Sequence, residues 1–239
     1  MLKKFLYKIH VLIKFILKRI AVLLTVNIYQ RPMAFSIIYN EFPSLQKTKI
    51  YRTREELWNS SLLLSNNPAI SYVEFGVLEG YSIDYFSKKN SEKKSTFIGL
   101  DSFEGLPDDW DSIPKGTLNV GGKIPKLNDS RISFLKGWFI DTSSILLRHL
   151  HKHKSNNLVV NFDADLYSST LYSLTEIDSL KKDYIAIFDE FAGHEARALY
   201  NYSQSHNAKI TFLGRTIYNF EPWTVLCKIT PHKPIGITK

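Results

Sequence analysis

Cysteine is almost absent from this sequence, and so are long uncharged apolar runs. The one cysteine, Cys227, excludes an intrachain disulfide framework and offers no thiolate cluster for a metal. We therefore expect a reducing compartment, with the cytoplasm as the default. The chain shows no internal repeat, and its 239 residues with 44% hydrophobic content suffice for one sizeable core. We expect one domain, residues 32–239, with an N-terminal appendage, residues 1–31.

Acidic residues are missing from residues 1–31, and this segment holds most of the excess positive charge of the chain. The formal net charge is +8, and seven basic residues lie in the segment: Lys3, Lys4, Lys8, Lys14, Lys18, Arg19 and Arg31. Residues 32–239 are therefore close to neutral, and they contain no basic stripe that would follow phosphates. We expect no nucleic-acid partner.

Residues 2–24 show a basic amphipathic pattern. At 100° per residue, the basic residues and Tyr7 share one side of a helix and the apolar residues share the other. The apolar side contains Leu2, Phe5, Leu6, Ile9, Leu12, Ile13, Ile16, Ile20, Leu23 and Leu24. A spanning helix needs about 20 nearly uncharged residues, which Lys14, Lys18 and Arg19 interrupt. We expect a helix in the interface of an anionic membrane, at its inner face. Packing on the domain, dimerisation and a signal anchor are the alternatives.

Short β-branched runs alternate with helical patterns from residue 53 onward, which is typical of a parallel sheet covered by helices. Seven strands are predicted, at 70–74, 96–101, 131–135, 158–162, 184–188, 209–213 and 224–229. Helices are predicted from a capping box at 53–56 to about 64, and at 82–89, 142–153, 170–181 and 194–204. About ten residues join the last two strands, too few for a crossover helix, so these strands should pair antiparallel. A doubly wound, Rossmann-like α/β sheet of seven strands with an antiparallel last strand is the architecture of class I methyltransferases.

Two glycines follow the first core strand in the pattern Glu74-x-Gly76-x-x-x-Gly80, and a helix is predicted to begin at Ser82. Glycine has no Cβ to keep a ligand from the backbone, and the N-terminus of a helix can bind a carboxylate such as the methionine end of S-adenosylmethionine. Tyr81 and Ser82 add hydroxyl donors. The spacing departs from the Gly-x-Gly-x-x-Gly pattern of nicotinamide sites. We interpret the loop as an S-adenosylmethionine cradle, and a ligand-free turn is the alternative.

Asp101 ends the next predicted strand, where a carboxylate can accept both ribose hydroxyls of an adenosine-containing cofactor. A cap or turn aspartate is the alternative, and this position does not separate NAD from S-adenosylmethionine. Residues 102–130 follow without periodicity. Because long loops in compact domains are usually functional or disordered, we interpret this segment as a lid or substrate loop.

Four carboxylates follow two further predicted strands: Asp163, Asp165, Asp189 and Glu190. The carboxyl ends of parallel strands form one ligand crevice, so these acids should lie together. Like charges at close range are unfavourable unless a cation or a proton joins them, and Mg²⁺ is the simplest explanation. Helix capping is the alternative for the three aspartates. The metal would acidify a substrate hydroxyl. His194 is a candidate base or substrate contact, or a structural histidine.

Five strings occur in one order along residues 53–229. They are Glu74-Phe-Gly-Val-Leu-Glu-Gly-Tyr-Ser82, Gly99-Leu-Asp-Ser-Phe-Glu-Gly-Leu-Pro107, Lys136-Gly-Trp-Phe139 with Asp141-Thr142, Asp163-Ala-Asp-Leu-Tyr-Ser-Ser-Thr170, and Asp189-Glu190. Together they resemble the macrocin and mycinamicin O-methyltransferase family, Mg²⁺-dependent enzymes that methylate sugar hydroxyls of macrolides. The N-terminal helix lies outside this resemblance.

The resemblance implies roles for individual residues. It assigns the cofactor to Glu74, Gly76, Gly80, Tyr81, Ser82 and Asp101, with Gly137 and Trp138 near the adenine end. It assigns the metal to Asp163, Asp189 and Glu190. Members of the sugar-methylating branch often have a second aspartate where this chain has Glu190, whose longer arm can still ligate Mg²⁺. Leu166 stands where catechol-type enzymes carry a lysine base, which leaves Asp165 and His194 as candidates.

The leading hypothesis is an O-methyltransferase acting on a sugar hydroxyl of a glycan or glycosylated lipid at the membrane surface. The first alternative is methylation of a soluble secondary metabolite, with the N-terminal helix serving dimerisation. The second is a binding protein that keeps the fold without turnover. The clustered acids argue against the second alternative, because like charges destabilise a site that binds no cation.

Overall fold

The computed structural model describes residue 34 and residues 36–64, 68–154 and 156–233. The predicted helix over residues 2–24 and the boundary near residue 31 lie outside these ranges, so both stay predictions. None of the helices within the described ranges combines the length and the apolarity that crossing a bilayer requires.

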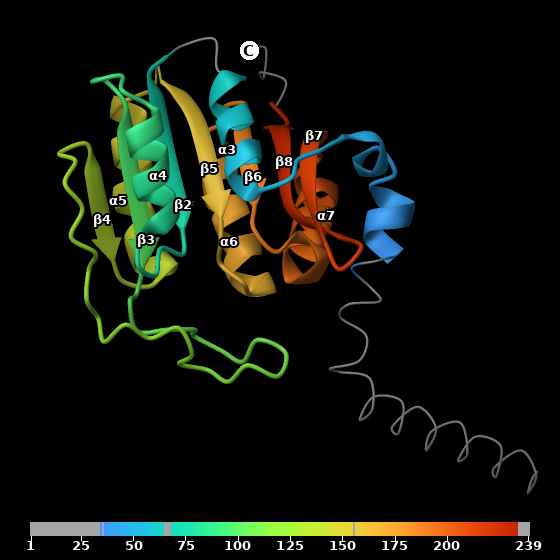
Figure 1. The fold of residues 1–239 in the computed structure, drawn as a ribbon, viewed down its shortest axis with the longest axis horizontal. Coiled ribbons are helices and arrows are strands. Elements are labelled where there is room, and N and C mark those ends of the chain that lie inside the picture. The colour runs from blue at the N-terminus through green and yellow to red at the C-terminus, as the bar shows by residue number, and fades with distance from the viewer. Residues whose placement is uncertain (1–33, 35, 65–67, 155, 234–239) are drawn as a thin grey trace, which may run out of the picture.

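An eight-stranded sheet forms the centre of the molecule, in the order β1-β7-β8-β6-β5-β2-β3-β4 (Figure 1). The strands are β1 (Lys49–Ile50), β2 (Ile70–Phe75), β3 (Thr96–Asp101), β4 (Ile132–Lys136), β5 (Asn157–Phe162), β6 (Tyr184–Phe188), β7 (Lys209–Tyr218) and β8 (Glu221–Thr230). Neighbouring strands pair parallel except at β8, which is antiparallel to both β6 and β7. The predicted doubly wound sheet with an antiparallel last strand is confirmed.

Two details of the sheet differ from the prediction. All seven predicted strands are present, but β1 is an eighth, a two-residue strand beside β7 that is too short to leave a periodic signal. The last two strands are also longer than predicted, at ten residues each. Only Asn219 and Phe220 remain between them, with φ of 48° and 67°. Positive φ at both positions is typical of a tight hairpin turn, and the antiparallel pairing is as predicted.

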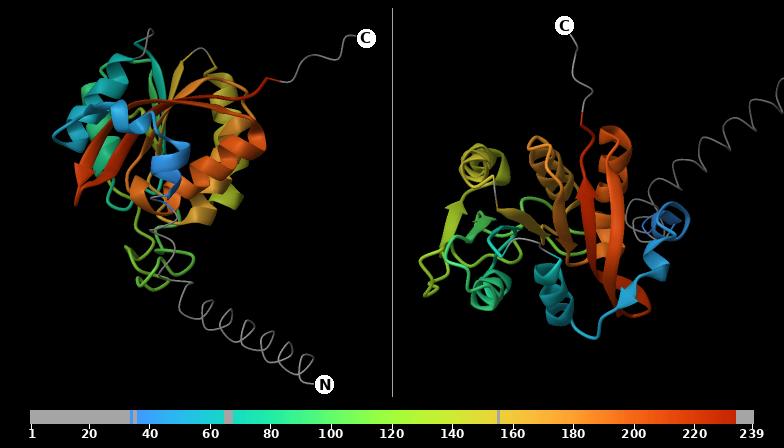
Figure 2. Two further views of the ribbon diagram at one scale, coloured as in Figure 1. Left: turned by 90° about the vertical axis from the view of Figure 1, so that its right-hand side faces the viewer. Right: turned by 90° about the horizontal axis from the view of Figure 1, so that it is seen from above.

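Helices cover both faces of the sheet. They are α3 (Arg54–Leu63), α4 (Tyr81–Lys89), α5 (Phe139–Lys152), α6 (Tyr167–Asp178) and α7 (Ala196–His206), with short turns η1 (Ile37–Glu41), η2 (Leu45–Lys47) and η3 (Phe191–Glu195). Helices α3 and α4 pack on a cluster around Tyr72 and Phe97, whereas α5, α6 and α7 pack on the other face around Val73 and Leu100. The right-hand view of Figure 2 shows the two layers on either side of the sheet.

Two helices begin three residues earlier than predicted. The prediction placed the starts of α5 and α6 at residues 142 and 170, whereas they begin at Phe139 and Tyr167. Their N-cap residues are Trp138 and Leu166, and neither caps the helix with its side chain. The usual Ser, Thr, Asp or Asn signal is therefore missing at the true start of each helix.

The capping box predicted at residues 53–56 is present at the start of α3. Thr53 Oγ1 accepts a hydrogen bond of 3.2 Å from the Glu56 amide, and Glu56 Oε2 accepts one of 3.0 Å from the Arg52 amide. These bonds satisfy two backbone donors that a helix N-terminus would otherwise leave free. They also fix the direction of Arg54, the first residue of the helix.

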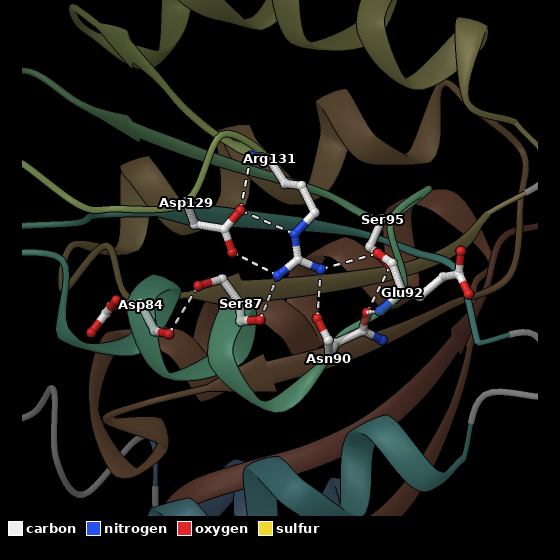
Figure 3. Close-up of polar contacts among 7 residues, drawn as sticks. All are labelled: Asp84, Ser87, Asn90, Glu92, Ser95, Asp129 and Arg131. Atoms are coloured by element: carbon white, nitrogen blue, oxygen red, sulfur yellow. Dashed lines mark hydrogen bonds and ion pairs between the residues drawn. The ribbon is translucent and has the colours of Figure 1, made fainter.

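Arg131 organises a polar cluster at the amino end of β4 (Figure 3). Its guanidinium donates to the carbonyl oxygens of Ser87 at 2.7 Å and Asn90 at 2.6 Å, and it pairs with Asp129 at 2.6 Å. A cation at the carboxyl end of α4 is favourable because it satisfies the last carbonyls of the helix and complements its dipole. We refer to these residues as the Arg131 cluster. The cluster lies at the amino ends of the strands, opposite their carboxyl ends.

Residues 102–130 connect β3 to β4 and run beneath the carboxyl ends of the strands in Figure 1. Two isolated bridges, Glu104 with Asn119 and Trp110 with Ile113, give the segment a local shape. The parallel strands and this long loop therefore meet at one edge, where the site is built.

Candidate active site

A cavity of about 850 Å³ opens at the carboxyl ends of β2, β3, β5 and β6. That volume lies within the range of roughly 300–1,000 Å³ common for small-molecule sites. Its lining combines residues 76–78 after β2, residues between 101 and 118, residues 137–140 at the start of α5, and acids after β5 and β6. The loop predicted to be a lid or substrate loop thus forms one wall, and its mobility stays a prediction.

Gly76 allows the loop after β2 to pass against β5. Its φ is +90°, and a Cβ there would lie 1.8 Å from the carbonyl oxygen of Asp163. No other residue type fits without moving the strand ends apart. Gly80, with φ of +80°, is the N-cap of α4, and a Cβ there would meet Pro125 and Leu127 of the long loop at 3.3 Å. Both glycines therefore allow close packing of the chain, and of the two only Gly76 lines the cavity.

Asp101 lines the cavity and braces the loop after β2. Its Oδ2 accepts hydrogen bonds from the amides of Val77 at 2.8 Å and Leu78 at 2.9 Å, and its Oδ1 accepts one from the Phe103 amide at 2.7 Å. The two amides engage both lone pairs of Oδ2, whereas Oδ1 keeps one lone pair for a further donor. Asp101 can therefore hold the loop and still accept a ribose hydroxyl, which stays a prediction.

Glu74, Tyr81 and Ser82 point away from the cavity. The Glu74 carboxylate is fully buried and accepts hydrogen bonds from Tyr72 Oη at 3.0 Å and from Ser82 Oγ. Burial raises the pKa of Glu74 to about 8. Tyr81 Oη donates to Glu55 Oε1 at 3.1 Å. The hydrogen bonds of these side chains connect α3, α4 and β2. In this arrangement the side chains would support ligand binding by holding the loop after β2 in place.

Gly137 and Trp138 line the cavity at the end of β4, and their place near the adenine end of the cofactor stays a prediction. The Gly137 amide donates to the Asp101 carbonyl at 2.9 Å, which ties the start of α5 to the end of β3. The Trp138 side chain is partly exposed and lies beside Ile140 on the cavity lining. This end of the cavity is therefore its apolar end, which suits the flat face of an adenine ring.

The four acids predicted to lie together all line the cavity: Asp163, Asp165, Asp189 and Glu190. Their charges perturb one another. Burial, followed by the charge of Asp189, raises the pKa of Asp163 well above its usual value. Burial, followed by the charge of Glu190, raises the pKa of Asp165 to about 7. We refer to these four residues as the carboxylate cluster.

Neighbouring groups compensate the negative charge of the carboxylate cluster only in part. Arg54 Nη1 pairs with Asp189 Oδ2 at 3.5 Å, which is at the outer limit of a hydrogen bond. Glu195, an acid that the sequence analysis did not single out, lies buried behind the cluster, and burial raises its pKa well above the usual value. Its Oε2 has no hydrogen-bond partner among the described residues. Within the described ranges, no three His, Cys, Asp or Glu side chains are arranged to hold a metal ion.

A smaller hollow of about 280 Å³ adjoins the carboxylate cluster. It shares Trp110, Asp165 and Glu190 with the larger cavity. Its other lining residues are Asp111, Ser112, Ile113, Ala192, Gly193, His194, Glu221 and Trp223. The described lining therefore combines two indole rings with four carboxylates and contains no lysine or arginine.

His194 is buried at this hollow and engaged through both ring nitrogens. Its Nδ1 accepts a hydrogen bond of 3.1 Å from the Tyr167 amide, and its Nε2 lies 3.2 Å from Asp111 Oδ1. A backbone amide can only donate, so Nδ1 is the acceptor and the ring proton is on Nε2, where it donates to Asp111. In this arrangement His194 has no free lone pair.

The sequence analysis gave no role to Arg54, Trp110, Glu195 or Trp223, which line or underlie the site. Trp110 lies in the aperiodic loop that was predicted to be functional, which is the one signal that could have identified it. Arg54 looks like an ordinary residue of a capping box, and Trp223 lies in β8, just before the strand predicted at 224–229. Only the folded chain brings these residues to the carboxylate cluster.

Comparison with known proteins supports the fold. No protein-family model matches the chain, and no curated protein sequence matches it. Among solved structures, the O-methyltransferase NovP is similar with a TM-score of 0.54 and 22% identity, over 72% of this chain and 78% of NovP. The chain has the fold of a class I methyltransferase. The macrolide-sugar branch that the motifs resemble stays a prediction.

Two further solved structures are similar to the chain at lower TM-scores. An O-methyltransferase from Bacillus cereus in complex with SAH has a TM-score of 0.48 and 12% identity, over 89% of this chain and 96% of that one. TomG from Streptomyces achromogenes, in complex with SAM, has a TM-score of 0.47 and 11% identity, over 90% of this chain and 95% of that one.

Proposed function

We propose that the chain is an S-adenosylmethionine-dependent, Mg²⁺-dependent O-methyltransferase that acts on a sugar hydroxyl of a glycan or glycosylated lipid at the membrane surface. One observation carries this proposal. A cavity at the carboxyl ends of the strands joins the Gly76 loop and Asp101 to the carboxylate cluster, in a class I methyltransferase fold shared with the O-methyltransferase NovP. The crevice at these strand ends is where open α/β sheets bind ligands.

S-adenosylmethionine, when bound, supplies a methyl group on a positively charged sulfur. The backbone at Gly76 would contact its methionine end, and Asp101 would accept a hydrogen bond from one of its ribose hydroxyls. Gly137 and Trp138 would contact its adenine. This orientation is supported by the distribution of polarity in the cavity, whose acids lie after β5 and β6 and whose exposed apolar side chains lie at the start of α5.

Asp163, Asp189 and Glu190 would hold Mg²⁺, which supplies a positive charge that acidifies the bound hydroxyl. Oxygen ligands of this kind suit a hard cation. Burial, followed by the charges of Asp189 and Asp165, raises the pKa of Asp163, and a cation in the cluster would offset this cost. Because no three acids are arranged around one point among the described residues, their side chains would have to turn toward the ion.

Asp165 is our candidate for the general base, and His194 is not. Asp165 lines both the larger cavity and the smaller hollow. The hydroxyl proton would pass to its carboxylate as the oxygen bonds to the methyl carbon. His194 would instead hold Asp111 in the wall of the hollow through Nε2.

The smaller hollow would hold the acceptor. Indole rings such as those of Trp110 and Trp223 can pack against the apolar face of a sugar ring, and carboxylates can accept hydrogen bonds from its hydroxyls. The four acids in its lining also make the hollow unfavourable for a phosphate. In a glycosylated lipid, the phosphate would therefore lie outside it.

A binding and transfer experiment tests the chemistry. We expect S-adenosylhomocysteine to bind the wild-type chain in a calorimeter, more tightly with Mg²⁺ than without it. Asp163→Ala should remove the Mg²⁺ effect, whereas Asp183→Ala, a surface acid paired with Lys228, should leave it intact. Labelled cofactor with a panel of glycans and soluble metabolites then identifies the acceptor. Absence of cofactor binding would exclude the methyltransferase, and transfer only to soluble metabolites would exclude the glycan.

A vesicle experiment tests the membrane. The full chain should sediment with vesicles containing anionic lipid and not with neutral vesicles, because residues 2–24 carry basic residues on one side. Replacing Lys14, Lys18 and Arg19 by Glu should abolish sedimentation. The same change at the exposed Lys93, Lys94 and Lys126 is the matched control. Equal sedimentation of both variants would exclude the membrane tether.

A further inference from the structure

Arg54 brings a positive charge to the acidic cavity. It is the first residue of α3, and its side chain is part of the cavity lining. The guanidinium carbon lies 5.1 Å from the ring centroid of Trp58 and 5.2 Å from that of Tyr81. Aromatic contacts of this kind engage the face of a guanidinium, while its N–H donors lie in its plane. The two rings therefore hold Arg54 in place without using its hydrogen-bond donors.

The acidic contacts of Arg54 are long. Its Nη1 lies 3.5 Å from Asp189 Oδ2, and its Nε lies 3.5 Å from Glu55 Oε1. Charge-assisted hydrogen bonds are normally about 2.7–2.9 Å long. The Arg54 side chain is also 42% exposed. Its five donors therefore have capacity for an anion that enters the cavity.

The helix ends beside Arg54 favour an anion at the same place. Arg54 begins α3 and contacts the ring of Tyr81, which begins α4. A helix N-terminus carries partial positive charge, so a guanidinium beside two of them is unfavourable unless an anion is close. The N-cap of α4 is Gly80, which offers no side-chain acceptor to the first-turn amides. Three acids in the first turns of the two helices, Glu55, Glu56 and Asp84, offset part of this charge, and Arg54 lies 3.5 Å from carboxylate oxygens of Glu55 and Asp189.

We propose that Arg54 binds the carboxylate of the methionine end of S-adenosylmethionine. This inference rests on the proposed function of the cavity as the cofactor site. The carboxylate is the anionic group of that cofactor, and Arg54 lies on the same lining as Gly76, at the end of the cavity away from Trp138. The carboxylate would take up the in-plane donors of the guanidinium. Trp58 and Tyr81 act as positioning residues, because they hold the guanidinium at the start of α4.

Two ligands separate recognition of the carboxylate from recognition of the rest of the cofactor. S-adenosylhomocysteine carries the carboxylate, whereas 5′-methylthioadenosine has the same adenosyl group and sulfur without the amino acid. We would titrate both into the full-length wild type, Arg54→Met and Arg54→Lys in a calorimeter. Arg52→Met is the matched control, because Arg52 is exposed, lies two residues away and changes the net charge equally.

We expect Arg54→Met to weaken S-adenosylhomocysteine binding at least tenfold and to change methylthioadenosine binding less than twofold. Arg54→Lys should retain part of the preference for S-adenosylhomocysteine, because it keeps the charge without the planar fork. Arg52→Met should match the wild type. Equal weakening of both ligands by Arg54→Met, or no weakening of either, would overturn the inference. Binding of neither ligand by the wild type would instead overturn the proposed function and this inference with it.

Discussion

Arg131 lies at the amino ends of the strands, and Asp163 lies at their carboxyl ends. The two surroundings differ in how completely neighbouring groups compensate the charge. The Arg131 guanidinium donates to carbonyl oxygens of Ser87, Asn90 and Glu92 and pairs with Asp129 (Figure 3). Asp163 has acids beside it instead, and burial, followed by the charges of Asp189 and Asp165, raises its pKa. At the amino ends of the strands a partly buried cation has oxygen partners, whereas at the carboxyl ends like charges lie beside one another.

This difference separates residues that stabilise the fold from residues that we expect to serve function. A guanidinium that closes a helix end and a strand end with short hydrogen bonds contributes to the folded state. A group of neighbouring carboxylates destabilises it, and the cost is recovered when a cation or proton enters the cluster. We therefore expect substitutions in the Arg131 cluster to change stability and leave ligand binding intact. Substitutions in the carboxylate cluster should do the reverse.

The largest effect is expected at Asp165. Asp165→Asn should lower the methyl transfer rate about 10²–10⁴-fold, which is the usual contribution of a general base. Its melting temperature should stay the same or rise, because one of several like charges is removed. His194→Gln is the control within the site and should change the rate less than tenfold. Single-turnover rates with labelled cofactor and melting curves measure both properties. A large loss with His194→Gln and none with Asp165→Asn would reverse the assignment.

Arg131→Met tests the other edge. We expect it to lower the free energy of unfolding by about 2–4 kcal/mol, because several backbone carbonyls and Asp129 lose a charged partner together. Binding of S-adenosylhomocysteine by the folded variant should equal that of the wild type. Urea unfolding and calorimetry measure the two quantities. Lys93→Met, at an exposed lysine next to Glu92 of the cluster, is the matched control. A change below 0.5 kcal/mol would contradict a stabilising role for the cluster.

Glu74 shows what burial of one acid does to the pH dependence of stability. Its pKa is 4.5 ordinarily and about 8 in the folded chain, so between these values the folded state binds a proton that the unfolded state has released. The stabilisation is complete below pH 4.5 and is lost as the pH rises through 8. Glu74→Gln should make the slope of unfolding free energy against pH less negative by up to about 1.4 kcal/mol per pH unit. Urea unfolding at pH 5, 6, 7 and 8 measures it, and an unchanged slope would contradict the raised pKa.

Thr53 gives the smallest expected effect and refines the comparison. It lies next to Arg54 on the site side of the molecule, yet its hydroxyl is paired with the Glu56 amide. Thr53→Ala should therefore cost about 1 kcal/mol of stability, as for other lost N-caps. The exposed Ser91→Ala is the control. A loss of stability equal to that of the control would show that the cap contributes nothing.

Much of the fold could be predicted from the sequence because its signals are local. The runs at 96–101 and 184–188 are apolar strands bounded by polar residues, and both were predicted with their observed ends. The acids at the ends of β5 and β6 could be assigned to one crevice, because parallel strands end at the same edge. Strand β1 could not be predicted, because two exposed residues have no pattern and gain their structure from β7.

The orientation of side chains at the site could not be predicted to the same degree. The loop from Glu74 to Ser82 was predicted as a cofactor cradle, but only Gly76, Val77 and Leu78 of it line the cavity. Glu74 and Ser82 bond to each other instead. Spacing along a chain shows that a loop turns into a helix, whereas the direction of each hydroxyl depends on neighbours from α3 and β2.

The sequence by itself determined the order of strands and helices, the antiparallel last pair and the edge at which the acids gather. These follow from periodicity, connection length and the polarity of strands, which are properties of short segments. Only the tertiary structure decided that Arg54, Trp110 and Glu195 belong to the site and that His194 has no free lone pair. Those facts depend on contacts between residues distant in the sequence. The residues that surround a buried side chain cannot be read from a short segment, because the packing of the whole chain brings them together.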